Sequence, residues 1–499
     1  MHKITFFKNF SAYLFLFFMI SNLSVFSQVG IGTTTPDASA VLDVSSTTQG
    51  LLTPRMTTAQ KLAITSPANG LMVYDTTLKA FNYYDSSATS WLNMTASASD
   101  GRLKFKRIKS TDVLATVLDS EKTAGGGTKY LLDSQTLYEI NGTVSVDLPI
   151  ELNNAYVVGL DSSDDKLVKS SGDLFTGITG GSIRVLTLVA SSGNVFNITG
   201  TGSIGAGTQT QNLIVRDAII ASSSNVGKIE NFSLVFVSII QFAGNTTGIV
   251  YKDINKLLIN NAGWFGNNSG TYETLQGTFG LVAKIGGFTE VVGSSVGFSV
   301  VSNPIITNDA VLREVVFTGA VTSGKYVNGY TVGSYSGFNF DNKWAVNCPG
   351  IPNESDLSAT GDVNFDYPVG SGASTSFFGS TKTKLLGTTT SNNLFRFSTD
   401  AANNRLKYLG TKKRYFRVNG SLSFQSSSNA TTYIVYIAKN GTVVNQSKVY
   451  INSTTTNDIL AIPIGTTLEL SPNDFVEVFA ERYSGSGNML TVSLNLSIN

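Results

Sequence analysis

Histidine and cysteine, the side chains that most often do chemistry in enzymes, are almost absent from this chain. Its 499 residues contain one histidine, His2, and one cysteine, Cys348. We expect the segment that holds His2 to be removed, so the mature chain would have no imidazole to act as a general base or to bind zinc. The composition therefore excludes Ser-His-Asp and Cys-His catalysis, His-ligated zinc, intrachain disulfides and paired-cysteine metal sites.

Carboxylates and basic residues are the remaining candidates for catalysis. Glycoside hydrolysis needs two carboxylates on either side of the scissile bond, whereas a polysaccharide lyase could use basic side chains. The candidate acids are Asp164, Asp165, Asp217, Glu230, Asp253, Glu273 and Glu290, and the candidate bases are Arg184, Arg216 and Lys252. They are scattered, so we predict no catalytic residues and no enzymatic activity. A lyase or glycoside hydrolase stays open as the alternative.

The segment Asp161-Ser-Ser-Asp164-Asp165 places hard oxygen ligands close together in the sequence. It lacks the spacing of an EF-hand or of nonapeptide calcium repeats. We therefore expect a solvated acidic turn, with no metal and no cofactor.

Four aromatic residues are the candidate ligand-binding residues. Tyr326, Tyr330, Tyr335 and Trp344 lie among glycines and serines, which is typical of a sugar-binding surface. The alternative is that residues 321–380 cap the preceding region, whose open end would expose apolar side chains and unpaired backbone. Capping is the favoured interpretation.

Residues 130–320 are the region that must position these side chains. Short β-branched runs recur there about every seventeen to thirty residues, within the range of a solenoid repeat. Glycine pairs supply corners between them, and Asn260-Asn261 and Asn267-Asn268 could form asparagine-bearing turns or ladders. We predict an all-β fold with a right-handed parallel β-helix here; a β-sandwich is the alternative, but it would need more regular alternation.

The N-terminal part divides into three segments. Residues 1–27 read as a signal peptide, with Lys3 and Lys8 before a short apolar core. Residues 28–95 predict a small module with a brief helix beginning at Thr57, whose spacing to Gln60 fits a capping box, and a hairpin over residues 70–84. Residues 96–129 read as a linker, in which charges alternate with apolar residues over residues 102–109, as in an amphipathic strand.

The N-terminal module resembles a known group of proteins. The residues that carry the resemblance are Gly30-Ile-Gly-Thr-Thr-Thr-Pro36, Leu42-Asp-Val44, Pro54-Arg-Met-Thr57, residues 70–75 and Trp91. They are similar to the N-terminal module of many secreted surface proteins of Bacteroidota, and related segments occur in phage tail fibres. The resemblance implies a trimerising or attachment element in an extracellular fibre, and it implies no catalytic residue.

Residues 381–499 predict a jelly-roll sandwich of eight to ten strands at short, even spacing. Residues 414–418, 439–441 and 473–478 resemble the C1q and tumour-necrosis-factor type domain that ends many phage and bacterial fibres. That resemblance implies a trimer with an aromatic-lined axis. The candidates for core or threefold contacts are Tyr415, Phe416, Tyr433, Tyr436 and Phe479.

The low charge and the expected export limit the functions that this protein could have. Only 14% of the residues are charged and the formal net charge is +1, so no nucleic-acid partner is expected. We expect a secreted or cell-surface protein without a membrane span, forming a homotrimeric fibre for adhesion to a carbohydrate or cell-surface ligand. Besides the enzyme, the remaining alternative is a purely structural part of a phage-derived fibre or surface assembly.

Overall fold

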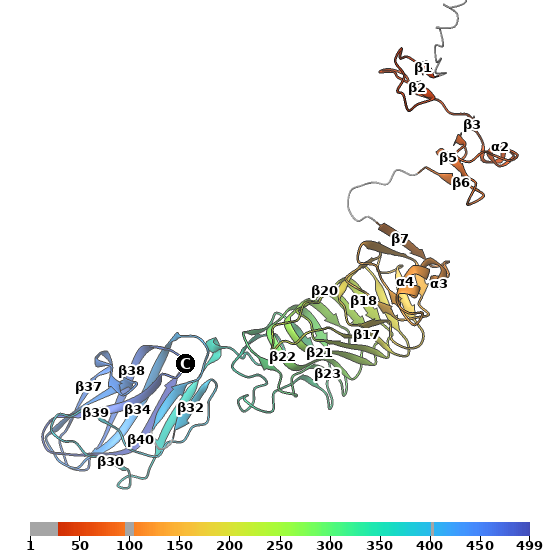
Figure 1. Ribbon diagram of the computed structural model, residues 1–499. Coiled ribbons are helices and arrows are strands. Elements are labelled where there is room, and N and C mark those ends of the chain that lie inside the picture. Colours follow the sequence, from red (N-terminus) through yellow and green to blue (C-terminus); the bar gives the residue numbers. More distant parts are fainter. Residues whose placement is uncertain (1–27, 95–103, 401–403) are drawn as a thin grey trace, which may run out of the picture. The chain divides into compact units, whose positions relative to one another are not determined.

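The computed structural model describes residues 28–94, 104–400 and 404–499. The predicted signal peptide lies outside the described residues. The chain divides into two compact units, residues 1–101 and residues 102–499, and the described parts of both are nearly all β (Figure 1). None of the described helices has the length and apolar character needed to cross a bilayer.

The described part of the first unit, residues 28–94, contains short strands and one helix. Its elements are β1 (Val29–Ile31), β2 (Leu42–Val44), β3 (Arg55–Met56), α2 (Thr58–Leu62), β4 (Met72–Asp75), β5 (Ala80–Asp85) and β6 (Ser90–Asn93). Strands β4, β5 and β6 pair antiparallel, which confirms the predicted hairpin. Thr57 caps α2 in a capping box with Gln60, also as predicted.

The larger unit begins with a 22-stranded region that we call the coil stack. It opens with β7 (Lys104–Lys109), α3 (Leu114–Val117) and α4 (Asp119–Ala124). The next strands are β8 (Tyr130–Leu131), β9 (Thr136–Asn141), β10 (Thr143–Ser145), β11 (Ile150–Glu151), β12 (Tyr156–Val158), β13 (Lys166–Lys169), β14 (Phe175–Gly177), β15 (Gly181–Arg184), β16 (Thr187–Ala190) and β17 (Asn194–Thr199). The remainder are β18 (Asn212–Ala221), β19 (Asn225–Glu230), β20 (Leu234–Ala243), β21 (Thr247–Trp264), β22 (Thr271–Glu290), β23 (Val296–Ser299), β24 (Ile305–Ile306), β25 (Ala310–Arg313), β26 (Val316–Thr318), β27 (Lys325–Asn328) and β28 (Trp344–Asn347).

Strands of the coil stack pair parallel with strands one coil further along the chain. Residues at the same position of successive coils therefore form columns (Figure 1). One inward column runs through Ile183, Val215, Val237, Ile259, Lys284, Leu312 and Val346. Aliphatic side chains that stack in this way form the continuous core of the region. Lys284 is the only polar member of this column.

One corner of the coils is a column of left-handed residues. Six successive coils place a residue with positive φ there: Val185, Asp217, Ile239, Asn261, Gly286 and Glu314. Each follows a strand position that is in register with its neighbours. The same bend therefore recurs in each of these coils, although only one of the six residues is a glycine.

The predicted asparagine ladder is confirmed at Asn268. Its Oδ1 accepts the backbone N–H of Asn245 at 2.9 Å and the Asn245 Nδ2 at 2.9 Å, while its own Nδ2 donates to the carbonyl of Phe242 at 2.7 Å. Both asparagines are buried. The ladder thus gives hydrogen-bond partners to buried backbone groups at the turns of two successive coils.

Both ends of the parallel pairing lie outside the predicted boundaries of residues 130 and 320. β7 pairs with β9, so residues 104–109, predicted as part of the linker, belong to the coil stack. At the other end β27 and β28 still pair parallel with β23 and β25. Their short strands are separated by glycine-rich loops, which hid the repeat in the sequence.

The rest of this unit is an antiparallel sandwich. Its elements are η1 (Asp356–Ser358), β29 (Gly361–Asp366), β30 (Ala373–Thr375), β31 (Thr383–Lys384), β32 (Phe397–Asp400), β33 (Arg405–Tyr408), β34 (Arg414–Ser426), β35 (Thr431–Lys439), β36 (Thr442–Val443), η2 (Asn445–Ser447), β37 (Val449–Ser453), β38 (Ile459–Leu470), β39 (Phe475–Ser484) and β40 (Met489–Ile498). Strands β29, β40, β34, β38 and β30 form one sheet, and β32, β33, β39, β35, β36, β31 and β37 form the other. Apolar residues of both sheets share one core.

Candidate functional site

The four candidate aromatics lie at the end of the coil stack. Trp344 and Tyr330 are buried, and the Trp344 indole donates to the Tyr330 hydroxyl at 3.0 Å, which in turn donates to the carbonyl of Pro304 at 2.7 Å. The half-buried Tyr326 donates to the carbonyl of Gly319, and the Tyr335 ring packs edge-on against Phe395. These contacts are internal packing, as expected of a cap, but residues 321–380 are not a separate capping segment, because β27 and β28 continue the coil stack and β29 and β30 belong to the sandwich. Ligand binding by these four residues stays a prediction.

The candidate carboxylates do not gather around one opening. The Asp165 carboxylate accepts the backbone N–H groups of Gly142, Leu160 and Asp161. Although burial raises its pKa, these hydrogen bonds outweigh that effect and hold the pKa of Asp165 below its ordinary value. Asp164 is exposed. The acidic segment is therefore a turn held by its own backbone.

Most of the other candidate acids have separate partners, but Lys252 lies 2.7 Å from Glu230 Oε1 and 3.9 Å from Asp253 Oδ2. Asp217 pairs with Arg216, Glu230 with Lys228 and Lys252, and Glu273 with Lys284. Asp253 and Glu290 accept the backbone N–H groups of Thr278 and Gly266. Arg184 donates to the hydroxyl of Ser182. Within the described residues, no group of three or more His, Cys, Asp or Glu side chains could hold a metal ion.

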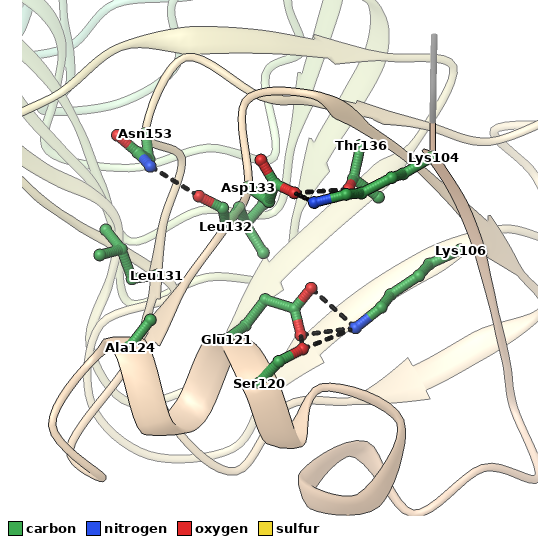
Figure 2. Close-up of a pocket in the computed structure, with 10 residues that line it drawn as sticks. All are labelled: Lys104, Lys106, Ser120, Glu121, Ala124, Leu131, Leu132, Asp133, Thr136 and Asn153. Atoms are coloured by element: carbon green, nitrogen blue, oxygen red, sulfur yellow. Dashed lines mark hydrogen bonds and ion pairs between the residues drawn. The ribbon is translucent and has the colours of Figure 1, made fainter.

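A pocket of about 500 Å³, which we call the end pocket, opens at the first coil. Figure 2 shows Lys104 and Lys106 reaching from β7 toward two acids. The Lys104 Nζ lies 2.7 Å from Asp133 Oδ2, and the Lys106 Nζ lies 2.7 Å from Glu121 Oε2. Lys104 and Lys106 point the same way because they are two residues apart on a strand.

The two acids of the end pocket are held in their charged form. Burial raises the pKa of Glu121, but hydrogen bonds from Lys106, Tyr138 and Ser120 outweigh it, so the pKa lies below its ordinary value. The Lys104 ammonium and the backbone N–H of Gln135 likewise lower the pKa of Asp133. A carboxyl with a lowered pKa is a poor general acid at neutral pH. The end pocket is suited to holding polar groups rather than to protonating a leaving group.

A second pocket, of about 550 Å³, lies where the coil stack meets the sandwich, and we call it the joint pocket. Asp356 organises it, because its carboxylate accepts from the Arg396 guanidinium, from the Thr411 hydroxyl at 2.9 Å and from the Lys412 backbone N–H at 2.9 Å. Arg396 is buried and also donates to the carbonyl of Trp344 at 2.5 Å. The wall of the joint pocket is therefore held in place by specific hydrogen bonds of Asp356 and Arg396.

The lining of the joint pocket is strongly basic. Six basic residues face two acidic ones there, and the basic residues are Arg313, Lys343, Arg396, Lys412, Lys413 and Arg414. The acids are Asp309 and Asp356, and Asp356 is already neutralised by Arg396. Lys413 makes only an exposed ion pair with Glu469, at 3.4 Å, which contributes little. The excess of cationic donors suits an anionic ligand.

Neither pocket was predicted from the sequence. The charge alternation over residues 102–109 correctly indicated the strand β7, but its acidic partners lie fifteen to twenty-nine residues away. The residues of the joint pocket are spread over a hundred positions, from Asp309 to Arg414. Of the predicted aromatics, only Trp344 lines it.

Comparison with known proteins identifies one segment. Residues 30–110 match a family described as "Phage tail like trimerisation region". The match includes the module for which a trimerising element was expected. No curated protein matches the chain.

Two solved structures are similar to parts of this chain. A tumour-necrosis-factor structure, Eiger from S. frugiperda, is 8% identical, with a TM-score of 0.21 over 28% of this chain and 92% of that chain. The enzymatically active domain of tailspike protein 4 from Bacteriophage CBA120 is 11% identical, with a TM-score of 0.29 over 90% of this chain and 77% of that chain.

Proposed function

We propose that this chain forms a secreted homotrimeric fibre at the cell surface, for adhesion to or recognition of an acidic carbohydrate. The trimeric, fibre-like part is supported by the match of residues 30–110 to a trimerisation region. The recognition part rests on the basic joint pocket. We propose binding without turnover, because Glu121 and Asp133 of the end pocket and Asp356 of the joint pocket are engaged by cations.

The single observation that carries the trimeric part of the proposal is the apolar surface of residues 29–94. In this described segment Val73 is the one large apolar residue that is buried. Apolar side chains at least half exposed include Val29, Ile31, Val41, Leu42, Leu51, Leu52, Leu62 and Leu78. A segment that buries so little apolar surface in one chain would gain stability by covering it with two further copies. The description of the matched family names that assembly.

The finer fold assignment belongs to the same proposal. We infer that the coil stack is a right-handed parallel β-helix, since crossovers between parallel strands of one sheet are right-handed in nearly all known cases. We also infer that the sandwich is a jelly roll of the C1q and tumour-necrosis-factor type. Phe416, Tyr433 and Tyr436 are buried in it, and Tyr415 is 68% exposed. Phe479 is half-buried, so Tyr415 is the most exposed member of the predicted set and the best placed to contact a neighbouring subunit.

Binding to glycans tests the recognition part of the proposal. The full-length protein should bind acidic polysaccharides in preference to neutral ones, and free sulfate or phosphate should compete only weakly. Arg313→Ala and Lys412→Ala should each weaken binding roughly tenfold or more, because each removes a charged donor. Arg417→Ala is the matched control, since Arg417 is exposed on the sandwich and does not line the joint pocket.

Two results would contradict the recognition proposal. Unchanged binding in both pocket variants would remove the joint pocket as the site. Binding to no glycan at all would favour a purely structural role in a fibre.

A further inference from the structure

A charged pair lies inside the coil stack. Its two residues belong to the same coil, and each stands in a different apolar column. Lys284 occupies the aliphatic column between Ile259 and Leu312. Glu273 interrupts a second column, between Ile249 and Phe298. Both side chains are 0% exposed, and Lys284 Nζ lies 2.8 Å from Glu273 Oε2. Each charged side chain stands at a position that is apolar in the neighbouring coils. The presence of one charge inside the core is therefore explained by the presence of the other.

The contact between them is not an ordinary buried ion pair. Neither carboxylate oxygen of Glu273 nor the Nζ of Lys284 has a partner in hydrogen-bond geometry. The two groups therefore meet at 2.8 Å outside the angular range of a hydrogen bond. Burying an ammonium and a carboxylate costs about as much free energy as their attraction returns, unless further hydrogen bonds assist. This pair has no such assistance.

A second buried pair in the same protein shows the contrast. Lys61 and Asp75 are also buried and 2.8 Å apart. There the Asp75 carboxylate accepts from the Thr58 hydroxyl and from the backbone N–H groups of Thr77 and Leu78, and Lys61 donates to Asn82. That pair has the hydrogen bonds that stabilise charges in an interior, and the pair in the coil stack lacks them.

We propose that Lys284 and Glu273 condense in the folded protein to form an amide cross-link between Nζ and Cδ. A proton first passes from the ammonium to the carboxylate, which removes both buried charges. The neutral nitrogen then attacks Cδ, the Nζ–Cδ bond forms, and the Cδ–O bond breaks. The hydroxyl leaves with a proton from the nitrogen as one water. Nothing is oxidised or reduced, and no co-reactant is needed.

Tyr251 is placed to assist as a proton donor. It lies on β21 two residues beyond Ile249, which pairs with Glu273, and its buried hydroxyl has no hydrogen-bond partner. Burial and the neighbouring Glu273 charge raise the pKa of Tyr251 well above its ordinary value. The hydroxyl therefore stays protonated and can relay the proton: it donates to the leaving oxygen and takes up the proton that the nitrogen releases.

Peptide mapping of the denatured wild-type protein tests the cross-link directly. Trypsin cleaves after unmodified lysine and arginine, so without the cross-link it releases residues 257–284. With the cross-link, cleavage after Lys284 is blocked, and the product spans residues 257–313 with the mass of one water missing. Release of residues 56–61, which requires cleavage after Lys61, is the internal control for a buried lysine without a cross-link.

The outcomes separate the two states of the pair. A full-mass peptide 257–284 as the main product would show an ion pair only and would overturn the proposal. The double variant Glu273→Leu with Lys284→Met keeps both columns apolar and should give no water-deficient product. Tyr251→Phe should slow the appearance of the cross-link in newly made protein, and an unchanged rate would remove Tyr251 from the reaction.

Discussion

Glu121 shows how single residues hold the first coil together. Its carboxylate accepts from Lys106, Tyr138 and Ser120 and so ties α4 to β7 and β9. Because its pKa in the folded protein is lowered, its contribution to stability is fully present above the unfolded pKa of about 4.3 and is lost as the pH falls through the folded value.

We therefore expect Glu121→Gln to destabilise the first coil by about 1–3 kcal/mol at neutral pH, because Lys106 loses its charged acceptor. The difference from wild type should shrink as the pH falls below about 4. Amide hydrogen exchange of α4 and β7 measures this local stability. Glu314→Gln, at an exposed carboxylate of the coil stack, is the control. A difference that does not depend on pH would contradict the assignment.

At the residue scale the sequence supports expectations about catalysis, but it did not locate the pockets. The chain has one histidine, His2, and one cysteine, Cys348, so we expect no His- or Cys-dependent catalysis, and this stays a prediction. The pockets could not be predicted in this way, because Lys106 and Glu121, or Arg313 and Lys412, become neighbours only through the winding of the chain. The sequence gives the identities of Glu273 and Lys284, but it does not show that both side chains point into the core.

At the element scale the corner column of the coil stack explains where strain is stored. Ile239 adopts φ 55°, a conformation that costs a β-branched residue roughly 1–2 kcal/mol. Its neighbours in the column include Asp217 and Asn261, whose side chains tolerate this conformation better.

Ile239→Asn should therefore stabilise the coil stack by about 1 kcal/mol, since the side chain is 50% exposed and loses little packing. Thermal unfolding compares this variant with Ile285→Asn, which changes an exposed isoleucine on a strand that has no positive φ at that position. An equal loss of stability in both variants would show that the corner carries no strain.

The asparagine ladder gives a second test at this scale. Asn268→Ala leaves the buried N–H of Asn245 without this partner, whereas the carbonyl of Phe242 keeps the backbone N–H of Phe265, and the change should cost about 1–3 kcal/mol. Asn267→Ala, which removes an exposed hydrogen bond to Gly244, should cost much less. Denaturant unfolding of the two variants measures the difference. Similar midpoints would mean that water replaces the ladder.

The predictions for elements succeeded where a local signal was strong. The capping box at Thr57 and Gln60 and the hairpin β4–β5 are short-range patterns, and both are confirmed. The extent of the coil stack was misjudged, because β7 pairs with β9 across two helices and β28 follows a long loop. Strand pairing between distant segments leaves little trace in either strand alone.

At the scale of the whole molecule the account depends on the apolar surface of residues 29–94. Leu51 and Leu52 are 66% and 75% exposed in the single chain. Covering a leucine contributes about 1.5–3 kcal/mol, and a substitution acts in all three copies of a trimer.

The double variant Leu51→Ser with Leu52→Ser should therefore dissociate at protein concentrations at least about tenfold higher than wild type. Val332→Ser removes a residue of the coil stack that is 73% exposed and serves as the control. Dilution series followed by light scattering give the comparison. Identical behaviour of the two variants would place the subunit contacts elsewhere.

The most direct test of trimeric assembly is the mass in solution of the chain that begins at Gln28, determined by sedimentation equilibrium. We predict three times the mass of one chain, unchanged over a wide range of protein concentration. A single-chain mass at micromolar concentration would contradict the proposed fibre.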